Sequence, residues 1–117
     1  MMDKNYYHTM LERERLIPFF DKDRLVCFLT FYIGNEADTD KFVRDDMWQA
    51  VDDSSDGDVC FIDHLIADKL KVNAKLSYDI WHRFKVYIKS NFPRVKIIRW
   101  NKFNKITGEV RTYKKEI

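Results

Sequence analysis

The chain has few of the residues that interrupt regular structure, with only three glycines and two prolines among 117 residues. It therefore has no glycine-rich loop of the kind that cradles phosphate groups. Its two cysteines, Cys27 and Cys60, are too few for a disulfide scaffold. Both lie in apolar runs, so we expect reduced core residues, and a disulfide only if the two runs form neighbouring strands.

Histidine is equally scarce, because the chain has only three, at positions 8, 64 and 82. They lie far apart, and neither a CxxC nor an HExxH pattern is present, so the sequence predicts no metal centre built from these residues. No apolar run approaches the roughly 18 residues of a membrane-spanning helix, and the polar beginning MMDKNYYHTM is not typical of a signal peptide. These absences favour a cytoplasmic protein without a membrane partner.

What the chain does have is hydrophobic and aromatic side chains, which make up 45% and 15% of its residues. That share supports a packed core, and the length suits one domain over residues 1–117. Residues 1–82 hold ten basic and seventeen acidic side chains, whereas residues 83–117 hold eleven basic and two acidic ones. The division predicts one surface that attracts anions. The many lysines, asparagines and isoleucines are compatible with a phage or bacterial protein.

Hydrophobic periodicity divides the chain into short helices and strands. Two apolar runs flank the polar residues 21–24 and predict a β-hairpin, in which Pro18 is typical of an edge strand. Residues 3–12 predict a helix with Tyr6, Tyr7, Met10 and Leu11 on one side. The expected order is helix 3–12, hairpin 15–35, helix 38–51, strand 59–67, helix 76–91, strand 95–103 and a returning strand 109–115.

This order predicts an α/β (α+β) fold with a mixed, mostly antiparallel sheet flanked by helices. A strand, a helix and a second strand in succession normally form a parallel pair through a right-handed crossover. Strands 59–67 and 95–103 are therefore expected to be parallel neighbours.

Asp63 and His64 stand side by side in the apolar run of residues 59–67. In a regular strand, neighbouring side chains point to opposite faces, so the two would not form a catalytic dyad unless a bulge re-aimed one of them. A buried carboxylate needs a partner, and a structural role fits both residues. Asp63 is the stronger candidate for a chemical role and His64 the weaker one.

The residues before this strand also fit a twelve-residue calcium loop, DDSSDGDVCFID. Oxygen ligands at the first, third, fifth and last positions would come from Asp52, Ser54, Asp56 and Asp63, with Gly57 at the turn. The last residue is aspartate rather than the longer glutamate, and the following residues lack the apolar face of an exit helix. A solvated acidic turn explains the same residues, so calcium binding stays open.

Cations alternate with aromatic side chains near the end of the chain. This mixture suits neutralisation of a nucleic-acid backbone together with base stacking, or an acidic protein partner. A half-exposed hairpin, with its aromatic rings in the core and its lysines in water, explains the pattern without any ligand. The candidate contacts are Arg99, Trp100, Lys102, Phe103, Arg111 and Tyr113.

Four segments between residues 16 and 103 resemble the core of the GCN5-related N-acyltransferase (GNAT) superfamily. They are the hairpin end LVCFLTFYIGN, the strand VCFIDHLIAD, the helix WHRFKVYIKSNFP and the strand VKIIRWNK. The chain is similar in particular to the toxin-activating lysine acyltransferases. In those proteins an FID-type strand, like Phe61-Ile62-Asp63 here, precedes a helix that ends in Phe-Pro, like Phe92-Pro93.

The resemblance implies that strands 59–67 and 95–103 splay apart and that the arm of an acyl carrier, such as acyl-CoA, binds in the gap. Asp63 would then assist transfer of the acyl group to an amine. The backbone that holds the thioester arm would come from Leu65, Ile66 and Ala67.

The resemblance also implies a glycine-containing phosphate loop within residues 68–77, where this chain has no glycine. Recognition of phosphates there would depend on the charge of Lys69, Lys71 and Lys75. Two functions therefore stay open. One is an N-acyltransferase-like protein, with its activity retained, altered or lost. The other is a non-catalytic module that binds nucleic acid or an acidic protein through residues 83–117.

Overall fold

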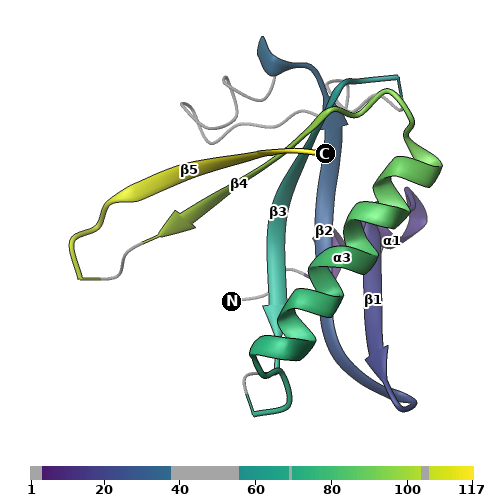
Figure 1. Ribbon diagram of the computed structural model, residues 1–117, viewed down its shortest axis with the longest axis vertical. Helices are drawn as coiled ribbons and strands as arrows, with labels where there is room; N and C mark the ends of the chain where they lie inside the picture. Colours follow the sequence, from purple (N-terminus) through teal and green to yellow (C-terminus); the bar gives the residue numbers. More distant parts are fainter. Residues whose placement is uncertain (1–3, 38–55, 69, 104–105) are drawn as a thin grey trace.

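The computed structural model describes residues 4–37, 56–68, 70–103 and 106–117, and it has an α+β fold (Figure 1). The expected helix at 38–51 and the first four residues of the possible calcium loop, 52–55, lie outside the described residues. The described elements are α1 (Lys4–Glu12), β1 (Leu16–Asp21), β2 (Arg24–Gly34), β3 (Val59–Ala67), α3 (Ala74–Asn91), β4 (Ile97–Phe103) and β5 (Val110–Glu116).

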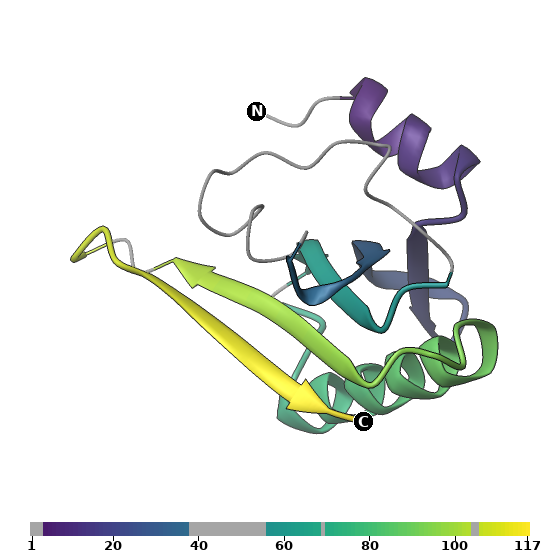
Figure 2. The ribbon, with the colours of Figure 1, turned by 90° about the horizontal axis from the view of Figure 1, so that it is seen from above.

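The strands form one five-stranded sheet in the order β1-β2-β3-β4-β5. Three of the neighbouring pairs are antiparallel, and β3 with β4 is the parallel pair, as the crossover through α3 predicted. Seen from above, α3 lies on one face of the sheet and α1 on the other (Figure 2). No helix in the described part of the chain is long and apolar enough to cross a membrane.

The predicted hairpin is confirmed, and its turn consists of Lys22 and Asp23, between the paired Asp21 and Arg24. Both turn residues have positive φ, at 49° and 70°, as a type I′ turn requires. Such a conformation costs roughly 1–2 kcal/mol for a residue with a side chain, so the pairing of the flanking strands must stabilise it. Pro18 is exposed on β1, which is an edge strand as predicted.

Helix α3 covers the sheet with the apolar stripe that its spacing predicted. Asn73 caps its first turn, because the side chain accepts a hydrogen bond from the backbone N–H of Leu76. Ile80, Phe84 and Ile88 are buried. Their partners in the core include Phe19, Val26, Cys27, Leu29, Phe31, Ile33, Cys60, Phe92, Val95 and Ile98.

Helix α1 packs on the opposite face through Met10, which is 2% exposed, and through the partly buried Tyr6 and Tyr7. Leu11, predicted on the same side of the helix, is 58% exposed and adds little to this packing.

The two cysteines are buried and form no disulfide with each other, as expected for core residues. Their strands β2 and β3 adjoin, but Cys27 pairs with Ala67 and Cys60 with Ile33, so the thiols are at opposite ends of the ladder. Burial raises the pKa of the Cys27 thiol, which makes it a poor nucleophile.

Candidate functional site

A β-bulge in β3 changes the expected relation between Asp63 and His64. Thr30 of β2 pairs with His64, and the next residue, Phe31, pairs with Ile62, so Asp63 is the extra residue of the bulge. Asp63 and His64 therefore lie on the same face of the sheet, the face that α1 covers. The prediction from a regular strand, which separated the two side chains, was wrong for this reason.

Asp63 takes part in a polar network with helix α1. The phenol of Tyr6 donates a short hydrogen bond to Asp63 Oδ2, and the same oxygen atom of Tyr6 lies 2.9 Å from Thr30 Oγ1. The Thr30 hydroxyl in turn accepts a hydrogen bond of 3.2 Å from the backbone N–H of His64. The carboxylate is thus fixed by a residue that precedes it by 57 positions.

His64 is held by the second tyrosine of α1. Its Nδ1 lies 3.0 Å from the hydroxyl of Tyr7, and its ring packs against those of Tyr6 and Tyr7. Its Nε2 lies 4.0 Å from Asp63 Oδ1, too long for a hydrogen bond. The geometry is therefore not that of a hydrogen-bonded Asp-His dyad, although the two groups face each other.

The surroundings of this cluster raise the pKa of both tyrosines. Burial, with the hydrogen bond to Asp63 as a second cause, raises the pKa of Tyr6 well above its usual value. Burial and the nearby charge of Asp63 also raise the pKa of Tyr7. Both tyrosines remain hydrogen-bond donors over the whole physiological pH range.

The parallel strands β3 and β4 are paired over only part of their length. The ladder runs from Val59 with Ile97 to Ile62 with Trp100, and the last residues of β3 continue beyond it. Figure 1 shows the β4–β5 hairpin diverging from β3 at this point. The bulge residue Asp63 directly follows the last paired residue.

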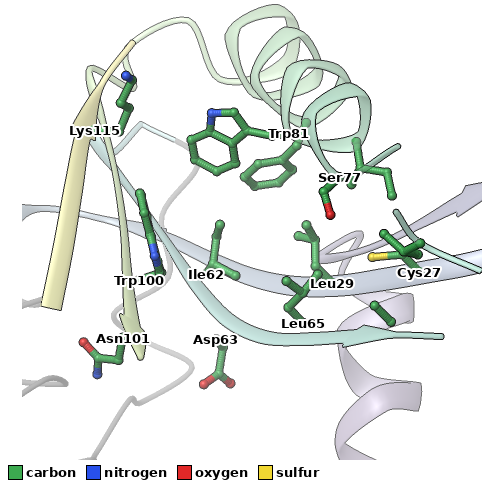
Figure 3. A pocket seen from close by; sticks show the side chains of 14 residues that line it. Cys27, Leu29, Ile62, Asp63, Leu65, Ser77, Trp81, Trp100, Asn101 and Lys115 are labelled. Atoms are coloured by element: carbon green, nitrogen blue, oxygen red, sulfur yellow. The ribbon is translucent and has the colours of Figure 1, made fainter. Parts of the chain in front are cut away.

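A cavity of about 550 Å³ lies on the α3 side of the diverging strands. Figure 3 shows Trp81 and Ser77 of α3 on one side, Ile62, Leu29 and Leu65 across from them, and Trp100 with Lys115 at the hairpin. The lining residues are Cys27, Leu29, Ile62, Asp63, Leu65, Ala67, Val72, Ser77, Ile80, Trp81, Phe84, Trp100, Asn101 and Lys115.

Most of this lining is apolar, whereas the side chains of Asp63 and Asn101 lie on the other side of the strands (Figure 3). Of the three residues expected to hold a thioester arm, Leu65 and Ala67 line the cavity. The side chain of Ile66 points to the opposite face, by the alternation of the strand.

The loop between β3 and α3 is organised by Asp68. Its side chain accepts a hydrogen bond from the backbone N–H of Leu70 and lies 3.3 Å from Lys71 Nζ. Lys75 is exposed in the first turn of α3. Lys69 lies outside the described residues, so two of the three predicted phosphate-binding lysines can be placed at this end of α3.

The residues predicted to contact nucleic acid divide between the two faces of the β4–β5 hairpin. Arg99 is only 4% exposed and donates to Glu36 Oε2 at 2.9 Å, so it does not lie on an exposed surface. The other described side chains of this set, those of Trp100, Lys102, Arg111 and Tyr113, are partly or fully exposed.

In the described residues, no group of three histidine, cysteine or acidic side chains is placed to hold a metal ion. Asp63, which would close the calcium loop, accepts a hydrogen bond from Tyr6.

Comparison with known proteins adds no family to this description. No model of a protein family matches the chain, and no curated protein matches it in sequence.

Several residues of the site could not be identified from the sequence. Tyr6 donates to Asp63, Thr30 contacts Tyr6, and Tyr7 contacts His64. Trp81 and Lys115 line the cavity. The one usable signal in the sequence was the prediction that Tyr6 and Tyr7 lie on the same side of a helix. That prediction shows which way the two rings point, but not which residues they contact.

Proposed function

We propose that the protein transfers an acyl group from a thioester, such as acyl-CoA or another acyl carrier, to an amine, as the GNAT superfamily does. One observation carries this proposal: a largely apolar cavity lies on the α3 side of the diverging parallel strands, and its lining includes the bulge residue Asp63, whose carboxylate lies on the other side of the strands. Neither the apolar lining alone nor the carboxylate alone would favour acyl transfer over simple binding.

The cavity suits the acyl part of the donor. Its walls of Leu29, Leu65 and Trp81 would remove methylene groups from water, which stabilises binding by about 0.8 kcal/mol for each group. The backbone of residues 65–67 continues beyond the β3–β4 ladder and would add its amide groups to an extended thioester arm.

The phosphate end of the donor would be recognised without a glycine loop. The side chain of Asn73 already accepts a hydrogen bond from one N–H of the first turn of α3. In the preceding loop, Asp68 accepts a hydrogen bond from the N–H of Leu70. Lys71 and Lys75 would therefore meet phosphates through charge, and this part of the donor would contribute modestly and be sensitive to salt.

The chemistry would place the acceptor amine beside Asp63, on the α1 side of the strands. The amine nitrogen attacks the thioester carbonyl, the new C–N bond forms, and the C–S bond breaks. Asp63 accepts the proton that the amine loses, and the leaving thiolate takes up a proton to become the free thiol. Tyr6 would orient the carboxylate, since its hydroxyl holds Oδ2.

Binding of thioesters tests the proposal. Acetyl-CoA, butyryl-CoA and hexanoyl-CoA should raise the melting temperature, and affinity should increase about fourfold per methylene as the apolar walls are covered. Trp81 and Trp100 line the cavity, so tryptophan fluorescence reports the same binding.

A matched pair of variants locates the site on β3. Leu65→Glu places a charge in the cavity wall and should weaken binding at least tenfold, because a carboxylate is costly against an acyl chain. Ile66→Glu makes the same change one residue away on the opposite face and should leave affinity within about twofold. Absence of any thioester effect on the wild type, or equal effects of the two variants, would exclude this cavity as the donor site.

A further inference from the structure

The β4–β5 hairpin is exposed to an unusual degree for part of a sheet. Every residue of β5, from Val110 to Glu116, is exposed. Figures 1 and 2 show the hairpin extending away from the two helices and the other strands. An exposed strand of this kind can contact a partner.

Strand register assigns the hairpin side chains to two faces. Trp100 packs edge-on against Trp81 of α3, with ring centroids 5.3 Å apart, which marks the α3-side face. Lys102 lies two residues along β4, and Arg111, Tyr113 and Lys115 pair with Lys102, Trp100 and Ile98. The five residues that share this face form what we call the basic hairpin face: Trp100, Lys102, Arg111, Tyr113 and Lys115.

The opposite face of the hairpin has a different character. Arg99 is buried, and its Nη1 lies 2.9 Å from Glu36 Oε2. Lys114 Nζ lies 4.0 Å from the same oxygen. Thr112 donates to Asn101 across the strands. The cations on that side are therefore directed to an acid of the protein itself, whereas Lys102 and Lys115 lie on the basic hairpin face.

Aromatic rings lie between the cations of the basic hairpin face. Trp100 and Tyr113 are stacked, with ring centroids 5.7 Å apart and an angle of 13° between their planes. Tyr113 remains 37% exposed. Arg111 lies 3.6 Å from Glu109, but both side chains are more than half exposed, so water screens this pair and leaves the guanidinium available.

The geometry points to single-stranded nucleic acid as the ligand of the basic hairpin face. Cations on both sides of a stacked ring pair match a chain in which phosphates alternate with planar bases. Unpaired bases are required, because a base inside a duplex cannot stack on a protein ring. An acidic protein would neutralise the cations, but its carboxylates would not stack on the exposed ring of Tyr113.

Fluorescence anisotropy with a labelled single-stranded oligonucleotide tests this inference on the whole chain. Three phosphate contacts predict a slope of about −2 for log K against log salt, so affinity should fall about twentyfold between 50 and 200 mM salt. Tyr113→Ala should weaken binding about fivefold to 150-fold, whereas Tyr113→Phe should retain it, because stacking needs only the ring.

Two lysines of β5 provide a matched control. Lys115→Gln should weaken binding and lower the salt slope by about 0.7, and Lys114→Gln, which removes the same charge from the other face, should do neither. Equal effects of these two variants would overturn the inference, as would a duplex of the same sequence binding equally well. Binding of polyglutamate that Tyr113→Ala does not alter, without binding of the oligonucleotide, would assign the face to an acidic protein instead.

Discussion

The Tyr6 hydroxyl provides the most quantitative test of the Asp63 network. Tyr6→Phe removes the donor to Asp63 Oδ2 and the contact with Thr30 while it preserves the ring. A hydrogen bond to a charged group contributes about 1.5–3 kcal/mol, so the variant should lose about 2 kcal/mol of unfolding free energy at pH 7.

The same hydroxyl makes this difference depend on pH. Burial and Asp63 raise the pKa of Tyr6 in the folded protein, so above pH 10 the unfolded chain loses a proton that the folded protein keeps. The stability that the raised pKa contributes is complete below pH 10 and is lost as pH rises. The wild type should therefore lose about 1.4 kcal/mol per pH unit more than Tyr6→Phe, and the two curves should converge near pH 11.5.

Urea unfolding from pH 7 to pH 12, followed by circular dichroism, measures both effects. Tyr78→Phe is the control, because Tyr78 is 75% exposed and its substitution should change the unfolding free energy by less than about 0.5 kcal/mol. Parallel curves for the wild type and Tyr6→Phe above pH 10 would refute the proposed link between Tyr6 and Asp63. So would a difference below about 0.5 kcal/mol at pH 7.

Two further predictions concern the scaffold. A methyl group on Gly57 would overlap the carbonyl oxygen of Gly34 and lie 2.7 Å from its Cα, so Gly57→Ala should cost about 3 kcal/mol or more. Gly108→Ala meets open space and should cost only about 1 kcal/mol for its positive φ, and similar unfolding free energies for the two variants would contradict this. Asn73→Ala removes the cap of α3 and should cost about 1 kcal/mol in thermal unfolding, whereas Asn73→Asp should be nearly neutral. A loss of the same size in Asn73→Asp would show that the cap is not the cause.

The elements of the fold followed closely from local patterns. The strand at 59–67, the turn at Lys22 and Asp23 and the apolar stripe of α3 each depend on residues near one another in sequence. The parallel pairing of β3 with β4 followed from the handedness of the crossover. Periodicity and turn chemistry are sufficient for such features.

The arrangement of the candidate site did not follow from local patterns. The bulge depends on the register between β2 and β3, and a register shift of one residue leaves no mark on the alternation of a short apolar run. The bond between Tyr6 and Asp63 joins residues 57 positions apart, and only the packing of α1 on the sheet brings them together. The cavity likewise depends on where the β3–β4 ladder stops.

Amine-dependent release of thiol from an acyl thioester tests the central claim most directly. Hexanoyl-CoA and a lysine-containing peptide are incubated with the protein, and the free thiol is measured with a chromogenic disulfide. We predict release that requires the peptide amine, forms the acylated peptide in equal amount, and falls at least 100-fold in Asp63→Asn while thioester binding is retained. Thioester binding without any amine-dependent release, or equal release by Asp63→Asn, would contradict the proposed role of Asp63.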